Sequence, residues 1–195
     1  HGLMQTLMNL NVSFGTTYWA SSPVIGAEPI SNGWCVKIGG VDPCTITSRA
    51  VVNATGLNAL ELSSEIFPKR TIPKANPIKG AYLRYTGKSP IKHIIYPAIV
   101  PGLIEERVDA TPDLSGSLRF GPSIEKTFGL EDFSMPTDLI ERFIPKIKKY
   151  LPDIDESKLI IDQAGIRPKI LSHSKKNEDF IFDWADDNGW LDLWG

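Results

Sequence analysis

An arginine late in the chain has the setting of a carboxylate-binding residue. Arg167 lies in Ala164-Gly165-Ile166-Arg167-Pro168-Lys169, between an apolar residue and a proline that fixes the backbone. A guanidinium held in this way can grip a carboxylate through two parallel hydrogen bonds. Taken alone, the pattern favours an ordinary arginine in a surface salt bridge, because most arginines are exposed. Arg167 therefore becomes informative only beside other motifs.

A turn of small residues earlier in the chain has the features of a ligand-binding turn. Val51-Val52-Asn53 is typical of an apolar strand, and Ala54-Thr55-Gly56 follows it and opens a helix. Small residues let a ligand approach the backbone closely, and a helix N-terminus offers N–H donors to an anion. A tight strand-to-helix turn without a ligand fits the same residues. Both alternatives stay open on the local pattern.

Several common catalytic motifs are absent from the sequence. It contains neither a Gly-x-Gly-x-x-Gly dinucleotide fingerprint nor a Gly-x-Ser-x-Gly nucleophile elbow. The segment from Gly80 to Gly87-Lys88-Ser89 ends like a phosphate-binding loop, but six residues separate its glycines where the motif requires four. We therefore expect a turn between two strands there.

Residue types that bind metals are sparse. His1, His93 and His173 lack the spacing of a metal site, so we expect no metal. Cys35 and Cys44 flank a predicted hairpin and are too few for a disulfide framework or a zinc cluster. A bond between them would be geometrically demanding, so we interpret them as free thiols in a reducing compartment.

The composition is that of an ordinary globular protein. Of 195 residues, 42% are hydrophobic, 9% aromatic and 23% charged, which excludes disordered, collagen-like and coiled-coil chains. Lys and Arg number 21 against 23 Asp and Glu, so we expect no nucleic-acid or anionic-membrane partner. No apolar run approaches the roughly 20 residues of a transmembrane segment. We expect an intracellular protein, cytoplasmic or mitochondrial, whose first residue, His1, indicates a processed start or a piece of a longer chain.

The first third of the chain predicts a helix, a meander and a strand–helix unit. Apolar residues at helical spacing over 3–10 predict the end of an amphipathic helix. Short β-rich runs then predict a small antiparallel meander, with strands at 16–19, 24–27, 34–38 and 45–47. A buried strand at 50–54 and a helix at 57–66 follow, before a connector punctuated by prolines.

The remainder predicts a second β-rich region and a kinked helix. Candidate strands lie at 81–85, 93–97 and 117–121. A loop is expected at 100–113 and a short strand at 180–182. Apolar residues on one face predict a helix over 138–151, which Pro145 should kink. Tryptophans near the chain end indicate an interface or a missing neighbour: Trp184, Trp190 and Trp194.

The order of several short segments carries more information than any one of them. They follow one another in a single register: His1–Gln5, Val51–Leu57, Lys79–Leu83, Ile95–Pro97, Asp113–Gly116, Arg119–Pro122 and Gly165–Lys169. This series resembles the FAD-dependent oxidoreductases of the D-amino-acid oxidase superfamily. Within the superfamily it is most similar to the branch related to L-2-hydroxyglutarate dehydrogenase and oxidase, over nearly the whole chain.

The resemblance implies a fold of class α+β or α/β. A partial Rossmann-like FAD-binding domain would be interleaved with a substrate domain built on an antiparallel sheet. Residues 1–75 would form the central part of the FAD-binding domain, residues 79–160 the substrate-binding domain, and residues 164–195 the return to the FAD-binding domain. The implied cofactor is FAD, and the implied substrate is a small-molecule carboxylate.

The resemblance also implies roles for individual residues. Four would contact the cofactor: Ala54, Thr55, Gly56 and Gly165. Arg167 would face the flavin and bind the substrate carboxylate, with Tyr96 and Lys79 lining the same cavity. Hydride transfer requires the substrate carbon to be held over the flavin, and a fixed arginine clamp supplies that positioning.

The sequence departs from the family pattern in three places. The N-terminal strand, with its glycine-rich loop and acidic ribose-binding residue, is absent, and so is the segment after Gly195 that closes over the flavin. These missing parts of the same polypeptide would be partners of the chain. Asp109 occupies a place where the family commonly has histidine, so no catalytic base is assigned.

The resulting hypothesis is FAD-dependent oxidation of a 2-hydroxy acid, such as 2-hydroxyglutarate, at the carbon alpha to its carboxylate. An amino acid is the alternative substrate class. A second hypothesis is a truncated homologue that has lost the flavin and acts as a non-catalytic binding or structural module. A third is a generic α+β binding domain with fortuitous motifs.

Overall fold

The chain folds into two compact units, each assembled from three segments of the sequence. The computed structural model describes residues 2–98, 106–127, 129–171, 180–185 and 189–195. Unit 1 comprises His1–Asn53, Glu61–Arg70 and Phe182–Asp192, and unit 2 comprises Ala54–Leu60, Thr71–Ile181 and Leu193–Gly195. Outside the described residues lie His1, His173 and residues 100–105 of the predicted loop.

Unit 1 begins with the predicted helix and meander. Helix α1 (Gly2–Ser13) is followed by an antiparallel sheet in the order β1 (Val24–Ile30), β2 (Gly33–Ile38) and β3 (Cys44–Ser48). The prediction of a strand at 16–19 is wrong, since that segment forms none. Its neighbouring aromatics, Tyr18 and Trp19, are both exposed, so it lacks the alternation that would bury one face. No helix in the described part of the chain is long and apolar enough to cross a bilayer.

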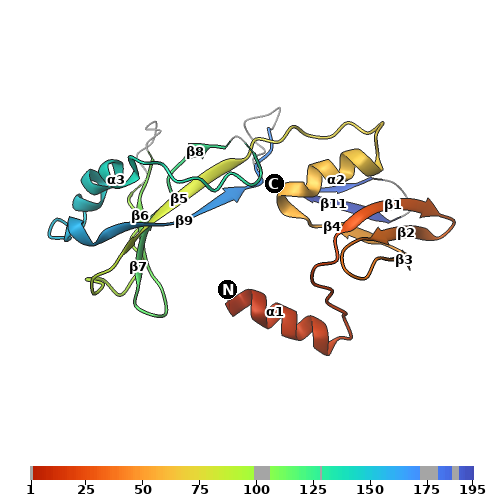
Figure 1. Cartoon of the computed structure of the whole chain (residues 1–195), viewed down its shortest axis with the longest axis horizontal. Coiled ribbons are helices and arrows are strands. Elements are labelled where there is room, and N and C mark those ends of the chain that lie inside the picture. The colour runs from red at the N-terminus through yellow and green to blue at the C-terminus, as the bar shows by residue number, and fades with distance from the viewer. Residues whose placement is uncertain (1, 99–105, 128, 172–179, 186–188) are drawn as a thin grey trace. The chain divides into compact units, whose positions relative to one another are not determined.

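A second small sheet in this part of the chain contains a parallel pair of strands. Its order is β10 (Ile181–Trp184), β11 (Trp190–Trp194) and β4 (Val51–Asn53), and β11 runs parallel to β4. The 3-10 helix η1 (Gly56–Asn58) and helix α2 (Ala59–Ile66) together form the helix predicted after β4. Figure 1 shows α2 beside the β11 and β4 strands. The strand β11 was not predicted.

The core of unit 1 is aromatic. The rings of Trp34, Phe67 and Trp190 meet edge to face, with centroids 4.8 to 5.6 Å apart. Such contacts contribute about 0.5–1.5 kcal/mol each beyond the burial of the rings. Trp190 is therefore buried within this core. Trp194, in unit 2, is buried as well, whereas Trp184 is 63% exposed. The predicted interface remains applicable to Trp184 alone.

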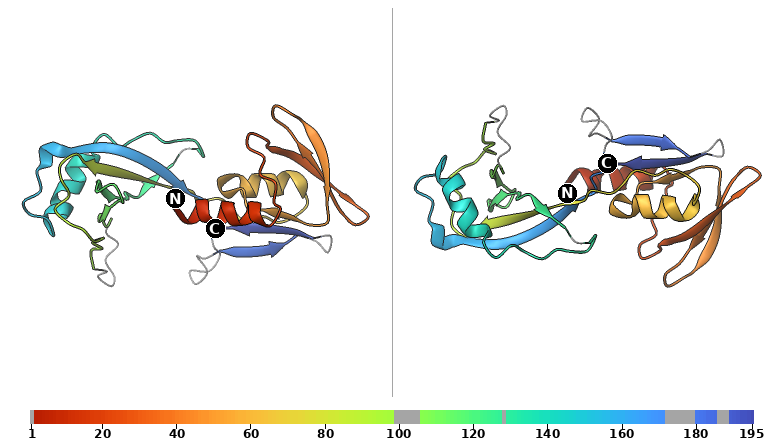
Figure 2. Two further views of the ribbon diagram at one scale, coloured as in Figure 1. Left: turned by 90° about the horizontal axis from the view of Figure 1, so that it is seen from below. Right: turned by 90° about the horizontal axis from the view of Figure 1, so that it is seen from above.

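Unit 2 contains a five-stranded antiparallel sheet with β5 (Ile78–Tyr85) at its centre. Along one edge β5 pairs with β7 (Leu118–Gly121) and β8 (Glu125–Lys126), and along the other with β9 (Leu159–Arg167). The strand β6 (Asp109–Pro112) pairs with β7. Figure 2 shows β5 and β9 side by side in both views, with α3 (Leu139–Lys148) at one end of the pair.

Helix α3 closes the core of unit 2. Its buried residues Leu139, Phe143 and Ile147 are four apart, which places them on one face of the helix. They pack with apolar residues of the sheet such as Leu83 and Phe120. Pro145 lies inside the helix, as predicted. The 3-10 helix η2 (Glu156–Lys158) then leads into β9.

Two predictions for the second β-rich region are wrong. Residues 93–97 form no strand and contribute only an isolated bridge between Ile95 and Ala110. Residues 109–112, predicted as loop, form β6, because they extend the sheet at the edge of β7. The structure also contains β9, which the sequence does not predict. Its centre, Asp162-Gln163-Ala164-Gly165, consists of residues with little β-propensity.

Candidate functional site

Two parallel strands end side by side where the small-residue turn begins. Asn53 of β4 pairs with Asp192 of β11, and both side chains are buried. The chain continues from these strands into Ala54-Thr55-Gly56 and Leu193-Trp194-Gly195. Adjacent carboxyl ends of parallel strands are a common place for ligands in α/β proteins. The fold thus provides the setting that the turn motif requires.

Gly56 is a glycine for a conformational reason. Its φ of 61° lies in the left-handed region that other residues rarely adopt. No atom lies within 4 Å of the position where a Cβ would stand, and Ala54, Thr55 and Gly56 are all exposed. The turn therefore presents bare backbone to open space at the start of the η1–α2 helix.

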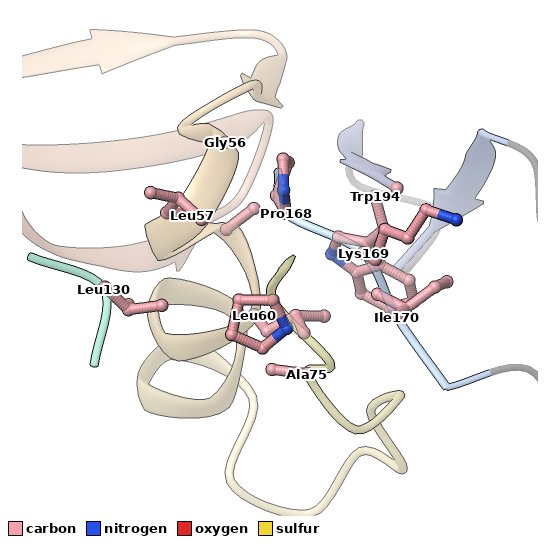
Figure 3. A pocket seen from close by; sticks show the side chains of 12 residues that line it. Gly56, Leu57, Leu60, Ala75, Leu130, Pro168, Lys169, Ile170 and Trp194 are labelled. Carbon is pink, nitrogen blue, oxygen red and sulfur yellow. The ribbon is translucent and has the colours of Figure 1, made fainter. Parts of the chain in front are cut away.

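The two candidate motifs meet within unit 2. These motifs line a narrow pocket of about 10 Å³. Figure 3 shows Gly56, Leu57 and Leu60 on one side of it and residues of the late motif on the other. The late motif contributes Pro168 and Lys169 to its lining. The turn after β4 and the segment after β9 are thus neighbours although more than a hundred residues separate them.

Arg167 is presented at the very end of β9. It pairs with Ile78 of β5, and its side chain is exposed. Within the described part of the chain, its guanidinium forms neither a salt bridge nor a side-chain hydrogen bond. It lines a cavity of about 580 Å³ together with Lys169, Phe180 and Gly195. The arginine is therefore available to an anionic ligand in this cavity.

Gly165 lies two residues before Arg167 and on the same face of β9. It is opposite Gly80 of β5, so two glycines face each other across the strands. Gly80 is required by packing, because a Cβ there would stand 2.8 Å from Cβ of Pro122. Gly165 has no such neighbour within 4 Å. A glycine in a strand that no packing contact within the chain requires often marks a place where a ligand approaches the backbone closely.

Lys79 and Tyr96 occupy other positions. Lys79 follows Ile78 on β5, so its side chain lies on the face opposite to Arg167. It is buried, and its Nζ is 3.0 Å from Oδ2 of Asp132 and 2.9 Å from Oγ of Ser134. Tyr96 is 67% exposed. Neither is among the described residues that line the Arg167 cavity.

Asp109, at the place where the family commonly has histidine, lies half-buried on β6. Burial raises the pKa of its carboxyl, and the positive charge of Arg107 partly opposes that rise. Burial, together with the negative charge of Asp109, also raises the pKa of Tyr150, whose Oη donates to the carbonyl of Val108 at 2.8 Å. The catalytic base stays unassigned.

The chain offers no metal site in the part that the structure describes, where no three His, Cys, Asp or Glu side chains cluster suitably. Cys35 and Cys44 are free thiols. In the β2–β3 ladder they pair with Thr47 and Ile38, not with each other.

Sequence comparison identifies a protein family. The family model described as FAD dependent oxidoreductase (DAO) matches residues 1–192. The chain is also similar to the mitochondrial L-2-hydroxyglutarate dehydrogenase of Arabidopsis thaliana, with 28% identity over 152 residues. That match covers 71% of the chain and 31% of the relative.

Solved structures share the fold. L-α-glycerophosphate oxidase from Mycoplasma pneumoniae, with FAD bound, gives a TM-score of 0.69 at 19% identity, over 88% of this chain and 44% of that one. Glycerol-3-phosphate dehydrogenase from Bacillus halodurans, complexed with FAD, gives 0.69 at 17% identity, over 93% and 36%. L-proline dehydrogenase from P. horikoshii gives 0.65 at 18% identity, over 93% and 46%.

These comparisons confirm the predicted fold class and the predicted cofactor of the family, FAD. The chain spans less than half the length of each of these relatives. Sequence reasoning missed one feature of the cavity: Lys169 lines it beside Arg167. The signal was present, because Lys169 closes the motif in which Arg167 was found.

Proposed function

Since the chain belongs to the DAO family of FAD-dependent oxidoreductases, we propose that the protein oxidises a 2-hydroxy acid to the 2-oxo acid at the carbon alpha to its carboxylate. The observation that carries this proposal is Arg167, an exposed guanidinium beside a cavity large enough for a small molecule. The likeness to L-2-hydroxyglutarate dehydrogenase supports a 2-hydroxy acid over an amino acid as the substrate.

The residues present fit a flavin. Gly56 and Gly165 both have open space where a Cβ would stand, so a ligand can contact backbone there. We propose that Ala54, Thr55 and Gly56 contact the pyrophosphate at the start of the η1–α2 helix, where N–H groups favour an anion. Bound FAD would accept the two electrons and one proton as a hydride.

In this proposal Arg167 positions the substrate. A bidentate pair between its guanidinium and the substrate carboxylate fixes both the distance and the orientation of the neighbouring carbon. Gly165, two residues away on the same strand face, leaves room for a flat ring beside that carboxylate. The proton of the substrate hydroxyl is transferred to a base, and no residue is assigned to that role.

The domain assignment follows from the same proposal. The antiparallel sheet around β5 would belong to the substrate-binding domain within residues 79–160, extended by β9. Residues 1–75 and 164–195 would contribute to the FAD-binding domain. We propose that other parts of the full-length polypeptide complete that domain, since the chain covers only 31–44% of these relatives. The compartment, cytoplasmic or mitochondrial, stays a prediction.

The test uses the full-length gene product. After purification and desalting, its visible spectrum should show flavin bands, and anaerobic L-2-hydroxyglutarate should bleach them. An amino acid that bleaches them instead would replace the substrate class. A protein that retains no flavin after incubation with FAD would support the non-catalytic module.

Arg167 is tested by substitution in the same protein. Because two charge-assisted hydrogen bonds are lost, Arg167→Ala should raise the KM on the order of 100-fold and leave FAD retention intact. Arg49→Ala is the matched control, since Arg49 is exposed, lies between β3 and β4 and is not among the described residues that line the cavity. Unchanged kinetics in Arg167→Ala would remove this residue from the site.

A further inference from the structure

Strand β9 contains a bulge in its middle. Its pairing with β5 shifts register between Ala81 and Leu83 of that strand. Two residues of β9, Asp162 and Gln163, therefore stand opposite a single residue of β5. Bulges of this kind are common beside functional sites, where they re-aim a side chain. Here the second bulge residue, Gln163, lies four positions before Arg167.

The bulge places Gln163 on the same face of β9 as Gly165 and Arg167. Side chains alternate between the two faces of a strand, and Ala164 packs against the hydrophobic core of unit 2 on the other face. Gln163, Gly165 and Arg167 are all exposed. No atom of the described residues lies within 4 Å of the position where a Cβ on Gly165 would stand. This face of β9 therefore presents bare backbone between a carboxamide and a guanidinium.

The polar group that the bulge presents beside Gly165 is electrically neutral. The side chain of Gln163 makes no hydrogen bond within the described part of the chain. Its neighbour Asp162 is engaged by two arginines: Nε of Arg119 donates to Oδ2 at 2.8 Å, and Nε of Arg84 lies 3.6 Å from Oδ1. Because these guanidinium groups balance the charge of Asp162, the group available to a ligand is the amide of Gln163.

The spacing of Gln163 and Arg167 suits two adjacent groups of one small molecule. Residues four positions apart in a strand have Cα atoms about 13 Å from each other. A guanidinium and an amide that hold neighbouring oxygens of a 2-hydroxy acid lie roughly 8 Å apart, given two ordinary hydrogen bonds. Side chains of this length span the difference by leaning along the strand toward each other.

We propose that Gln163 is a specificity-determining residue, whose carboxamide binds the oxygen on the carbon next to the carboxylate that Arg167 holds. A carboxamide both donates and accepts hydrogen bonds, so it fits the hydroxyl of the substrate and the oxo group of the product. The ammonium of an amino acid pairs best with a carboxylate, which this position lacks. The inference rests on the proposed function and adds the residue that favours a 2-hydroxy acid over an amino acid.

The kinetic test uses the full-length holoenzyme. Gln163→Leu removes the amide at nearly constant size, so kcat/KM for L-2-hydroxyglutarate should fall by about 3- to 10-fold, the loss of one neutral hydrogen bond. Gln163→Glu puts a carboxylate beside the reacting carbon. The ratio of kcat/KM for L-glutamate to that for L-2-hydroxyglutarate should therefore rise by about 10-fold or more.

Thr111→Val is the matched control for these variants. Thr111 is exposed on β6, and its register partner is Arg119, so it lies on the same face of the sheet. The strands β7 and β5 separate it from β9. Its loss of a hydroxyl should leave kcat/KM unchanged.

A binding measurement separates this inference from the proposed function, because it requires no turnover. 2-Oxoglutarate has an oxygen on the carbon next to the carboxylate, and glutarate has none. Titrated into the oxidised protein, both should perturb the flavin spectrum and raise the melting temperature. Gln163→Leu should weaken the binding of 2-oxoglutarate by about 3- to 10-fold and leave that of glutarate unchanged.

The outcomes that contradict the inference differ from those that contradict the proposed function. Equal weakening of both ligands, or an effect no larger than that of Thr111→Val, would show that Gln163 does not bind this oxygen. Loss of FAD from Gln163→Leu on desalting would assign the amide to the cofactor. If no 2-hydroxy acid reduces the flavin of the parent protein, the proposed function fails, and the comparison of the two ligands still decides whether Gln163 binds the oxygen.

Discussion

The side chains of Asn53 and Asp192 lie next to each other at the ends of two parallel strands, and Nδ2 of Asn53 donates to Oδ1 of Asp192 at 2.7 Å. Asp192 is fully buried and also accepts from Ser63, from Nε1 of Trp190 and from Arg70. One carboxylate thus ties β4, β11 and α2 together immediately before the turn Ala54–Gly56.

The first prediction concerns this carboxylate. Asp192→Ala removes one ion-pair partner of the Arg70 guanidinium, which also pairs with Asp183, and removes an acceptor from three other donors. Breaking a buried pair in this way should lower the free energy of unfolding by about 3–5 kcal/mol. Urea denaturation of the full-length protein measures the change.

The control for Asp192 is an ion pair in the same unit. Glu28 and Lys37 form a salt bridge across β1 and β2, and both side chains are largely exposed. Exposed pairs contribute little, so Glu28→Gln should leave the urea midpoint almost unchanged. If Asp192→Ala were equally mild, the buried network would not be the feature that holds β4 to β11.

Lys79 gives a prediction that separates a structural role from the expected contact with substrate. Its ion pair with Asp132 fixes the segment that contains Leu130, and Leu130 lines the narrow pocket next to Gly56. We expect Lys79→Met to lower the free energy of unfolding by about 1–3 kcal/mol, because Asp132 keeps Ser134 as a partner. The substrate KM should change less than in Arg167→Ala. A KM that rises as steeply as in Arg167→Ala would restore Lys79 as a substrate ligand.

Much of the fold follows from sequence patterns that are local. The helix over Leu139–Lys148 has apolar residues at a spacing that only a helix places on one face. The strands of the meander are short β-rich runs that turn residues separate. The secondary-structure prediction failed where a segment becomes a strand only because it pairs with a distant strand. Leu159–Arg167 becomes a strand because β5 offers it an edge, although its own central residues have little β-propensity.

The candidate site likewise combines residues placed by local sequence with residues placed by distant contacts. Gly165 and Arg167, two positions apart in one motif, lie on the same face of one strand. The position of Lys79 could not be read from its spacing, because it depends on a partner 53 residues away, Asp132. The register between β5 and β9 determines which side chains of the two strands share a face of the sheet. A local sequence pattern does not contain that register.

Two carboxylates should contribute to the pH dependence of the free energy of unfolding with opposite signs. Burial raises the folded-state pKa of Asp109, so its contribution is full below the unfolded pKa and is lost as the pH rises through the folded value. Hydrogen bonds from Ser115, chiefly from its side chain, lower the pKa of Asp113. The contribution of Asp113 is therefore present above its unfolded pKa and is lost as the pH falls through the folded value.

Two asparagine variants test these signs. Asp109→Asn should be more stable than the parent at pH 7, and the difference should shrink as the pH falls below the ordinary carboxyl range. Asp113→Asn should be less stable at pH 7, and its deficit should shrink in acid. Urea denaturation between pH 3 and 8 measures both curves, and variants that shift stability in the same direction at neutral pH would contradict the assignment.

The glycines that face each other across β5 and β9 give the last prediction, because the same substitution should act differently at each. Gly80→Ala brings a Cβ to 2.8 Å from Pro122, so the strand must shift, and stability should fall by about 1–3 kcal/mol. In Gly165→Ala the new Cβ meets no atom within 4 Å. Because alanine has less backbone freedom than glycine in the unfolded chain, stability should be unchanged or slightly higher. If a flavin or its substrate lies against this face, however, the new methyl group should weaken FAD or substrate binding by about 10-fold, since it intrudes on a close contact. Flavin fluorescence titration and the KM of the full-length protein measure that effect. A Gly165→Ala variant with normal stability, normal FAD affinity and normal KM would show that the open face of β9 beside Arg167 does not adjoin the ligand.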